Sequence, residues 1–360
     1  MSEEDRHFSE FAGLLKDDGP VAITLKQSLW PANDDDPVIF PPSYPLTTFK
    51  GRVHTIRDGD YRVSVELPPD TKREKNEGNA NQAAGYNIDR FLDGTNSCEI
   101  DSPQSQANRI EPMFKTHYHE LVPQVEITVG NGGAKVNLLV EAGHRAADAV
   151  VRMSSFADKF HSAFLDVRSG NHFTLATLAP TSLLFGVWDS RSTNVKLQRI
   201  VKAQIRATNV YERTRSAQFT PAANYVALGA VDEELDLKRG DNALSEEGMK
   251  HALAVQTAGG VMLTGKSEVT RIVHVNLAAL REIRGPDPKH TEVLRSYILG
   301  LALLAVVSDP DLNLREGCNL RLNDAVDTFK LVPRRDHGKL VTFDLTEVGD
   351  YAMSAAKEVF

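Results

Sequence analysis

The chain reads GVWDSRSTNVKLQRIVKAQIRATNVYERTRSAQFTP from Gly186 to Pro221, and this stretch concentrates positive charge. Seven Lys or Arg side chains lie between Asp189 and Arg215, against two acidic ones, which gives a local balance of +5. The whole chain of 360 residues carries a formal net charge of −8. A concentrated positive stripe on an acidic protein predicts that a polyanion is held at one defined place.

Projected at 100° per residue, residues 192–206 predict a helix with a basic and an apolar face. Asp189 or Ser190 is expected to cap it, with Arg191 beside its first turn. The alternative is a merely solvated amphipathic helix. Residues 193–206 contain no acidic side chain, so salt bridges along the helix do not explain the charge. The basic face is formed by Lys196, Arg199, Lys202 and Arg206.

Two further arginines, Arg213 and Arg215, follow next to Tyr211 and Phe219. Arginines beside aromatic side chains suit phosphate contacts and base stacking on a single nucleic-acid strand. The acidic overall balance argues against a protein that coats nucleic acid non-specifically, so binding is expected to depend on this local patch.

A second polar helix is predicted at residues 101–112, which read DSPQSQANRIEP. Ser102 suits the N-cap, Pro103 suits the first helical position, and Pro112 ends the helix. The polar side chains of the first two turns are Gln104, Ser105, Asn108 and Arg109.

The remaining pattern interleaves strands and helices irregularly, which predicts an α+β protein. With 41% hydrophobic and 25% charged residues, the composition is that of a soluble globular protein. We expect a buried strand at 175–187, strands within 261–275, a core helix at 291–307 and an amphipathic helix at 346–360. The apolar run 297–307 is too short to span a bilayer, and the N-terminus lacks a secretory pattern, so we expect a cytoplasmic protein without a membrane partner.

Metal and cofactor signals are weak. Cys98 and Cys318 lie far apart and form no CxxC, which favours buried free thiols in a reducing compartment. On a strand, His117 and His119 would share one face and could ligate a metal, but no further ligands follow at a recognisable spacing. Phosphate-cradling glycine motifs and nucleophile motifs are absent, so we expect no cofactor and no metal.

Several long motifs, in order, resemble one family. They are DSPQSQANRIE (101–111), EAGHRAADAVV (141–151), GVWDSRSTNVKLQRIVKAQIRA (186–207), GGVMLTGKSEVTRIVHVNLAALREIR (259–284) and RSYILGLALLAVV with LREGCNL (295–320). Together they resemble the backbone RNA-binding subunit of the type I-G (formerly I-U) CRISPR Cascade complex, a RAMP-superfamily protein of the Cas-seven kind. The resemblance covers residues 98–322.

The resemblance implies an RRM-like, ferredoxin-like palm with thumb and finger-like insertions. It implies palm strands and an insertion in 1–97, the RNA-binding core in 98–322 and a C-terminal extension in 323–360. Loop 68–82 and insertion 232–247 are candidates for the finger and thumb. The implied partners are CRISPR RNA, further copies of the chain along that RNA, other Cascade subunits and, through guide pairing, target DNA.

The resemblance also implies a binding protein rather than an enzyme. The residues expected to contact RNA are Ser102, Gln104, Ser105, Asn108, Arg109, Ser190, Arg191, Lys196, Arg199, Lys202, Arg206, Arg213 and Arg215. One alternative is a guide-directed target-RNA endonuclease of the type III kind, with Asp101 or Asp189 as the catalytic residue. Both aspartates also suit helix capping. Another is a metal hydrolase that uses His117 and His119.

Overall fold

The fold is described from a computed structural model of the chain, over residues 9–45, 52–58, 61–67, 84–130, 133–230, 244, 248–323 and 328–360. The chain forms two compact units. Unit 1 comprises residues 1–36, 99–208 and 266–360, and unit 2 comprises residues 37–98 and 209–265. The predicted functional division at 97/98 and 322/323 stays a prediction. Loop 68–82 lies outside the described residues, and so does insertion 232–247 apart from Leu244.

Unit 1 is built on a sheet whose strand order is β17-β18-β1-β16-β13-β8, and β19 joins β1 to β20. Strand β1 pairs antiparallel with β16 from Ala22↔Asn276 to Leu29↔Val269, and β16 pairs antiparallel with β13 on its other side. The strands are β1 (Ala22–Pro31), β8 (Asn96–Asp101), β13 (Val201–Thr208), β16 (Glu268–Asn276), β17 (Asn313–Arg315), β18 (Cys318–Leu322), β19 (Phe329–Val332) and β20 (Lys339–Val341).

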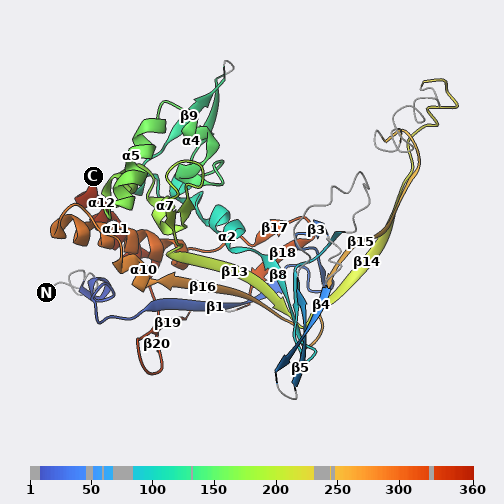
Figure 1. Ribbon diagram of the computed structural model, residues 1–360, viewed down its shortest axis with the longest axis horizontal. Helices are drawn as coiled ribbons and strands as arrows, with labels where there is room; N and C mark the ends of the chain where they lie inside the picture. The colour runs from blue at the N-terminus through green and yellow to red at the C-terminus, as the bar shows by residue number, and fades with distance from the viewer. Residues whose placement is uncertain are drawn as a thin grey trace. The chain divides into compact units, whose positions relative to one another are not determined.

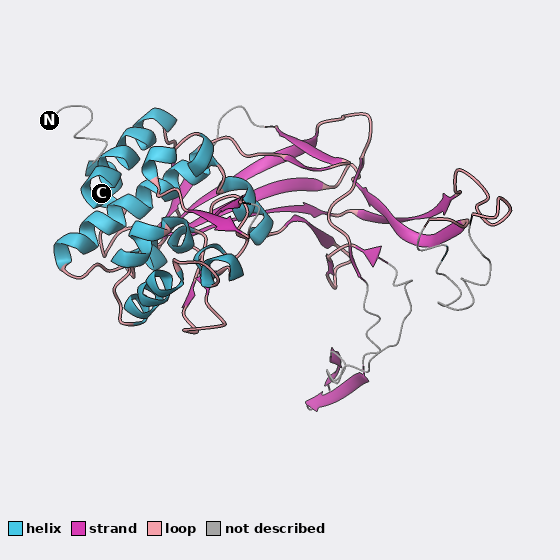
Figure 2. Cartoon of the chain, turned by 90° about the horizontal axis from the view of Figure 1, so that it is seen from above, coloured by secondary structure: helices cyan, strands magenta, loops and turns pink. Residues whose placement is uncertain are grey.

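Helices gather on this sheet, as the cyan ribbons of Figure 2 show. The α-helices are α2 (Pro103–Ile110), α3 (Met113–Thr116), α4 (Ala149–Arg152), α5 (Ala157–Arg168), α6 (Phe173–Leu178), α7 (Pro180–Leu184), α10 (Leu277–Arg281), α11 (Pro288–Val307) and α12 (Leu345–Val359). Two 3₁₀ turns, η1 (His119–Leu121) and η2 (Arg145–Ala147), connect some of them.

The core of unit 1 is centred on α11, which lies beside α12 in Figure 1. Residues Tyr297–Val306 of α11 are all buried, and the Tyr297 hydroxyl donates to the Leu121 carbonyl at 2.6 Å. Helix α11 has the length and composition of a membrane span, but 61% of its most apolar window is buried inside the protein. It therefore forms the predicted core helix. The C-terminal helix α12 is also where the sequence predicts one.

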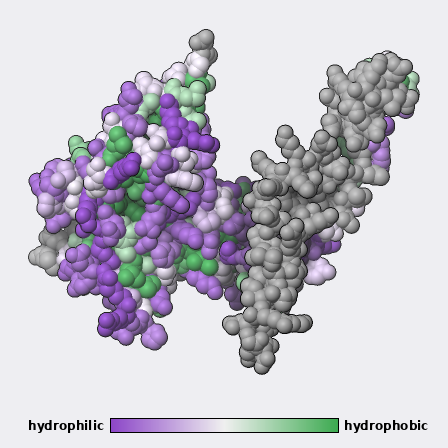
Figure 3. All heavy atoms as spheres, viewed as in Figure 1, coloured by the Kyte–Doolittle hydropathy of each residue, from purple (hydrophilic) through white to green (hydrophobic). Residues whose placement is uncertain are grey.

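Two short hairpins complete unit 1. Strands β9 (Glu126–Val129) and β10 (Ala134–Asn137) pair with each other, as do β11 (Val187–Trp188) and β12 (Lys196–Leu197). The face of unit 1 visible in Figure 3 is mostly hydrophilic, with scattered apolar side chains.

The described residues of unit 2 lie mainly in strands. These strands are β2 (Val38–Ile39), β3 (Tyr44–Pro45), β4 (Arg52–Asp58), β5 (Tyr61–Leu67), β6 (Ala84–Gly85), β7 (Ile88–Arg90), β14 (Tyr211–Phe219) and β15 (Ala252–Met262). Strands β14, β15 and β2 form one sheet, β3 pairs with β6, β4 pairs with β5, and β7 pairs with residues 96–98 of β8.

The structure corrects two predictions and refines a third. Residues 192–206 form no helix: they contain β12 and most of β13. The expected strand at 175–187 is the helix pair α6 and α7, with Pro180 at the start of α7. The strands within 261–275 exist, but β15 pairs with β14 and β2, whereas β16 pairs with β1 and β13. The chain is nevertheless a mixed α and β protein, as the class prediction states, and the strands of its main sheet that pair with β1 and β16 are antiparallel.

Candidate nucleic-acid interface

A groove of about 1040 Å³ lies within unit 1, where the start of α2, the β11–β12 hairpin and the strands β13 and β16 meet. Its described lining contains four Lys or Arg side chains and two histidines, but no Asp or Glu. The lining includes Gln104, Arg145, Trp188, Lys196, Arg199 and Lys202.

Strands β13 and β16 present one face to the groove, with Lys202, Gln204 and His274 beside the apolar Ile272. Along β13, Val201, Ala203, Ile205 and Ala207 are buried, so the intervening side chains lie on the opposite face. Lys202 pairs across the sheet with His274, and burial together with nearby Lys202 lowers the pKa of His274. A lowered pKa favours the neutral imidazole, which leaves Lys202 as the fixed charge of this pair.

Helix α2 supplies the next wall. Ser102 Oγ accepts from the Ser105 backbone N–H at 3.2 Å, and Pro103 occupies the first turn, as the sequence predicts. Gln104 Oε1 accepts from Arg199 Nη2 at 2.7 Å, while its Nε2 donates to the Gly143 carbonyl at 3.1 Å. Gln104 therefore holds the Arg199 guanidinium in place beside the groove.

Arg145 is the deepest cation of the groove. It is 2% exposed, and its φ of 53° places it in the left-handed region that non-glycine residues seldom adopt. Its Nε donates to Glu111 Oε2 at 2.8 Å and its Nη1 to the Gly186 carbonyl at 3.3 Å. Its Nη2 is buried without a hydrogen-bond partner among the described residues. A buried donor without a partner carries a desolvation cost that no described hydrogen bond offsets.

Arg199 and Arg145 act on each other electrostatically. Burial, and secondarily the positive charge of Arg145, lowers the pKa of Arg199, and its buried Nε also has no partner among the described residues. Burial raises the pKa of Glu111 to about 7, against the opposing effect of Arg145. The described carboxylate that pairs with Arg145 therefore binds its proton more tightly than an exposed glutamate does, which weakens its compensation of the Arg145 charge.

The β11–β12 hairpin forms the rim of the groove. Its loop is fixed by Asp189, which is buried and accepts from the Thr193 backbone N–H at 2.8 Å and the Thr193 hydroxyl at 2.7 Å. Gly186 precedes the hairpin with φ 78°, and a Cβ there would lie 2.9 Å from the Leu197 carbonyl oxygen. Only glycine fits this close approach of the two chain segments.

Five of the predicted RNA-contact residues line the groove: Gln104, Ser190, Lys196, Arg199 and Lys202. Because residues 192–206 are not helical, Ser190 and Arg191 stand in a hairpin loop and not at a helix start. Arg191 is exposed and Arg206 half-buried on β13, both outside the lining. Ser102, Ser105 and Asn108 stay on α2, where Asn108 Oδ1 accepts from Gln104 Nε2 at 3.0 Å.

The Arg109 side chain contacts β17, not the groove. Its guanidinium bonds Asp101 at 3.3 Å and the carbonyls of Asn313 and Leu314, and it lines a separate cavity. These contacts give Arg109 a structural role in joining α2 to β17. Its predicted RNA contact is not part of the groove.

Arg213 and Arg215 belong to unit 2, on β14. Both are exposed, and the Arg215 guanidinium lies 5.0 Å from the Phe40 ring centroid. Arg215 thus lies against Phe40, an aromatic side chain that the sequence did not predict as its neighbour.

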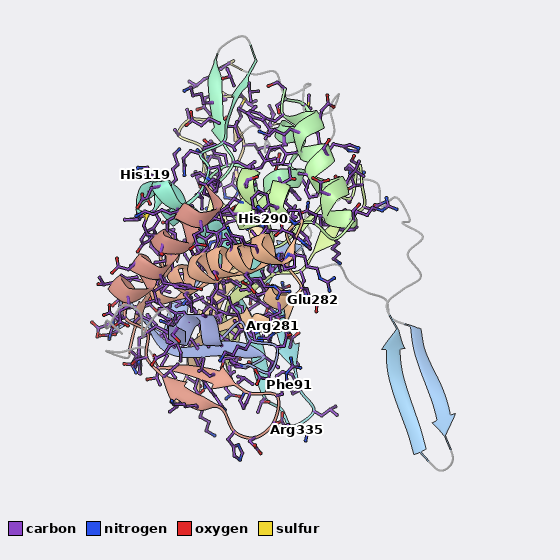
Figure 4. All side chains as sticks on the ribbon, turned by 90° about the vertical axis from the view of Figure 1, so that its left-hand side faces the viewer. Phe91, His119, Arg281, Glu282, His290 and Arg335 are labelled. Atoms are coloured by element: carbon purple, nitrogen blue, oxygen red, sulfur yellow. The ribbon has the colours of Figure 1, made fainter. Side chains whose placement is uncertain are left out.

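The strand geometry on which a histidine metal site depends is not present at His117 and His119. His117 ends α3 and His119 begins η1, so they are not alternate residues of a strand. His119 lies on the surface in Figure 4 and pairs with Glu120 at 3.2 Å. No group of three or more His, Cys, Asp or Glu side chains that could hold a metal occurs in the part of the chain that the structure describes.

Sequence reasoning missed Arg145, Trp188, Gln204 and His274. The strict alternation of VKAQIRAT in β13 and of VTRIVHV in β16 could have placed Gln204 and His274 on one face. No local pattern marks Arg145, because its role depends on Glu111 and Gly186, which are distant in sequence.

Comparisons with known proteins identify the family. The search of curated proteins gives no match. A family model described as CRISPR-associated protein GSU0053 matches residues 23–212, more than half of the chain, and its range includes the groove residues Gln104, Arg145, Trp188, Arg199 and Lys202. The chain therefore works in a CRISPR system and belongs to the GSU0053 family of CRISPR-associated proteins, the Cas7 family of type I-U/I-G.

Proposed function

We propose that this chain is the backbone subunit of a type I Cascade complex, which binds CRISPR RNA along its sugar-phosphate backbone and presents the guide for pairing with target DNA. The observation that carries the proposal is the groove of unit 1, lined by four Lys or Arg and no described carboxylate on a chain of net charge −8. Such a groove attracts a polyanion locally without making the whole surface attractive to nucleic acid.

The chemistry of the groove suits phosphates in particular. Arg199 is half-buried in the groove lining, and guanidinium groups bind phosphate oxygens in fixed geometry, while buried Arg145 adds positive charge nearby. Lys196 and Lys202 are exposed and add charge at the rim and on the sheet face. In the proposal, Arg199 positions one phosphate and the two lysines neutralise its neighbours.

The proposal includes the finer features that the family suggests. Several copies would assemble on one RNA with other Cascade subunits in the cytoplasm, and the antiparallel sheet of unit 1 with α2 and α11 against β13 would serve as an RRM-like palm. The chain would bind and not cleave. Asp101 accepts bonds from Gln106 and Arg109, and Asp189 holds the hairpin loop, so both buried aspartates already have structural partners.

The test is a pair of charge reversals matched in net charge. The variant Arg199→Glu/Lys202→Glu alters the groove, and Lys159→Glu/Lys289→Glu makes the same charge change at exposed positions on α5 and α11. We expect the groove variant to lose co-purifying CRISPR RNA and filter binding of guide RNA at physiological salt, and the control to keep both. Circular dichroism of both variants checks the fold, and Lys202→Glu alone serves if Arg199→Glu perturbs it.

The opposite outcomes are equally clear. Normal guide-RNA binding by the folded groove variant would remove this groove from the proposal. Bulk tRNA, or no RNA, in the protein purified from its native host would remove CRISPR RNA as the ligand. A Mg²⁺-dependent cleavage ladder on guide-paired RNA would replace the binding role with the endonuclease alternative.

A further inference from the structure

The rim of the groove carries an aromatic side chain that phosphate binding does not require. Trp188 is 57% exposed, although it lies in the β11–β12 hairpin directly opposite Lys196. Tryptophan is a costly residue to leave in water, and a large exposed aromatic beside a binding groove usually marks a contact surface.

Lys196 occupies only part of the surface of this ring. Its Nζ lies 5.3 Å from the centroid of the Trp188 ring, a cation–π contact. More than half of the surface of Trp188 is nevertheless exposed, which leaves room for another planar group.

The neighbours of Trp188 restrict what that group can be. Lys196, Arg199 and Lys202 line the same groove, and an apolar peptide seated on the indole would have to desolvate these charges without pairing them. A nucleotide brings an apolar π-face together with a phosphate, and thus satisfies the indole and the cations at once.

We propose that Trp188 is a stacking platform for one unpaired nucleobase of the bound strand. This inference rests on the proposed RNA binding and adds to it a contact to a base, where the groove cations contact phosphates. A base that stacks on Trp188 must expose its face, so the platform selects single strands, and it accepts any base because each has a π-face.

The fluorescence of Trp188 provides a direct readout. The chain contains two tryptophans, Trp30 and Trp188, so Trp30→Phe leaves Trp188 as the only indole. The full-length Trp30→Phe protein is titrated with a 12-nucleotide oligouridylate and with an abasic ribose-phosphate 12-mer that has the same phosphates. We expect quenching of Trp188 by oligouridylate and no comparable quenching by the abasic chain.

Affinities complete the test. Trp188→Ala should weaken oligouridylate binding by between about fivefold and about 150-fold, with abasic binding nearly unchanged, and Trp188→Phe should recover part of the loss. Two outcomes overturn the stacking platform alone. One is equal quenching of Trp188 by both oligomers. The other is RNA binding that leaves Trp188 fluorescence unchanged, together with unchanged oligouridylate affinity in Trp188→Ala. Failure of the Trp30→Phe protein to bind either oligomer, at low as well as physiological salt, overturns the RNA-binding proposal and the platform with it.

Discussion

At the scale of single residues, Arg145 shows how the fold keeps an unusual conformation. The residue is held in the left-handed region by its bonds to Glu111 and Gly186, and its guanidinium lies 5.3 Å from the Phe185 ring centroid. A strained backbone persists only where the surroundings over-determine it. Here three neighbours fix the guanidinium before any ligand arrives, which reduces the entropy that binding must remove.

Glu111 predicts a measurable pH dependence of stability. Its folded pKa of about 7 lies above its ordinary value near 4.5 because of burial, so the native state binds its proton more tightly than the unfolded chain does. The stabilisation is complete below the unfolded pKa and is lost as pH rises through 7. Its size is on the order of 3 kcal/mol at most.

Urea unfolding at pH values from 4.5 to 8 checks this prediction against Glu111→Gln, in which the titration is removed. The difference in unfolding free energy between the wild type and Glu111→Gln should decrease as pH rises across this range. A difference that is constant with pH would contradict the buried-proton account. Because other titrating groups are shared by both proteins, their contributions cancel in the comparison.

At the scale of elements, the sequence predicts α2 correctly and β13 wrongly, for a physical reason. The bounds of α2 depend on local chemistry: Ser102 caps the first turn and Pro103 needs no donor there. In β13 the spacing of the basic residues suggests one face of a helix. In the structure, however, every second residue is buried, and Ala203 and Ala207 are among these buried residues. The two alanines thus complete the period-two pattern of a strand, which the spacing of the basic residues does not reveal.

Segments buried on all sides are harder to predict for another reason. Residues 175–187 have an apolar run that suits a buried strand or a buried helix equally, and periodicity cannot separate the two. Pro180, which starts α7, was the available clue. The groove as a whole depends on contacts between α2, η2, β11 and β13, and such long-range proximity leaves no pattern in one sequence.

The packing of α11 on α12 gives an element-scale prediction. A Cβ at Gly300 would lie 2.7 Å from the Cα of Ala352, whereas a Cβ at Gly349 would have nothing within 4 Å. Gly300→Ala should therefore destabilise unit 1 by about 1–3 kcal/mol, because the clash with the backbone of α12 outweighs the better helix propensity of alanine.

Gly349→Ala is the matched control, since it gains propensity without a clash and should stabilise the protein by about 0.5–1 kcal/mol. Thermal or urea unfolding of both variants measures the two shifts. Equal stabilisation by the two substitutions would contradict this prediction, because it would mean that α11 and α12 move apart at Gly300 at little cost.

At the scale of the whole molecule, the charge distribution sets the salt dependence of binding. The groove gathers four Lys or Arg side chains on a chain of net charge −8. With four cations, log K for single-stranded RNA should fall against log salt with a slope of about −3. Lys202→Gln should make the slope shallower by about 0.7. Filter binding between 50 and 300 mM salt gives both values, and a wild-type slope near zero would argue against phosphate contacts.

The two buried cysteines provide one probe of local opening in each unit. Cys98 lies in unit 2 and Cys318 in unit 1; both are 0% exposed, and burial raises the pKa of Cys318 to about 12. A thiolate is the reactive form, so neither sulfur should react with an alkylating reagent until the structure around it opens. With excess reagent, the alkylation rate of each cysteine, read by peptide mass spectrometry, would time the opening around that sulfur. If RNA binds in the groove of unit 1, adding RNA should slow the alkylation of Cys318 and leave the alkylation rate of Cys98 unchanged.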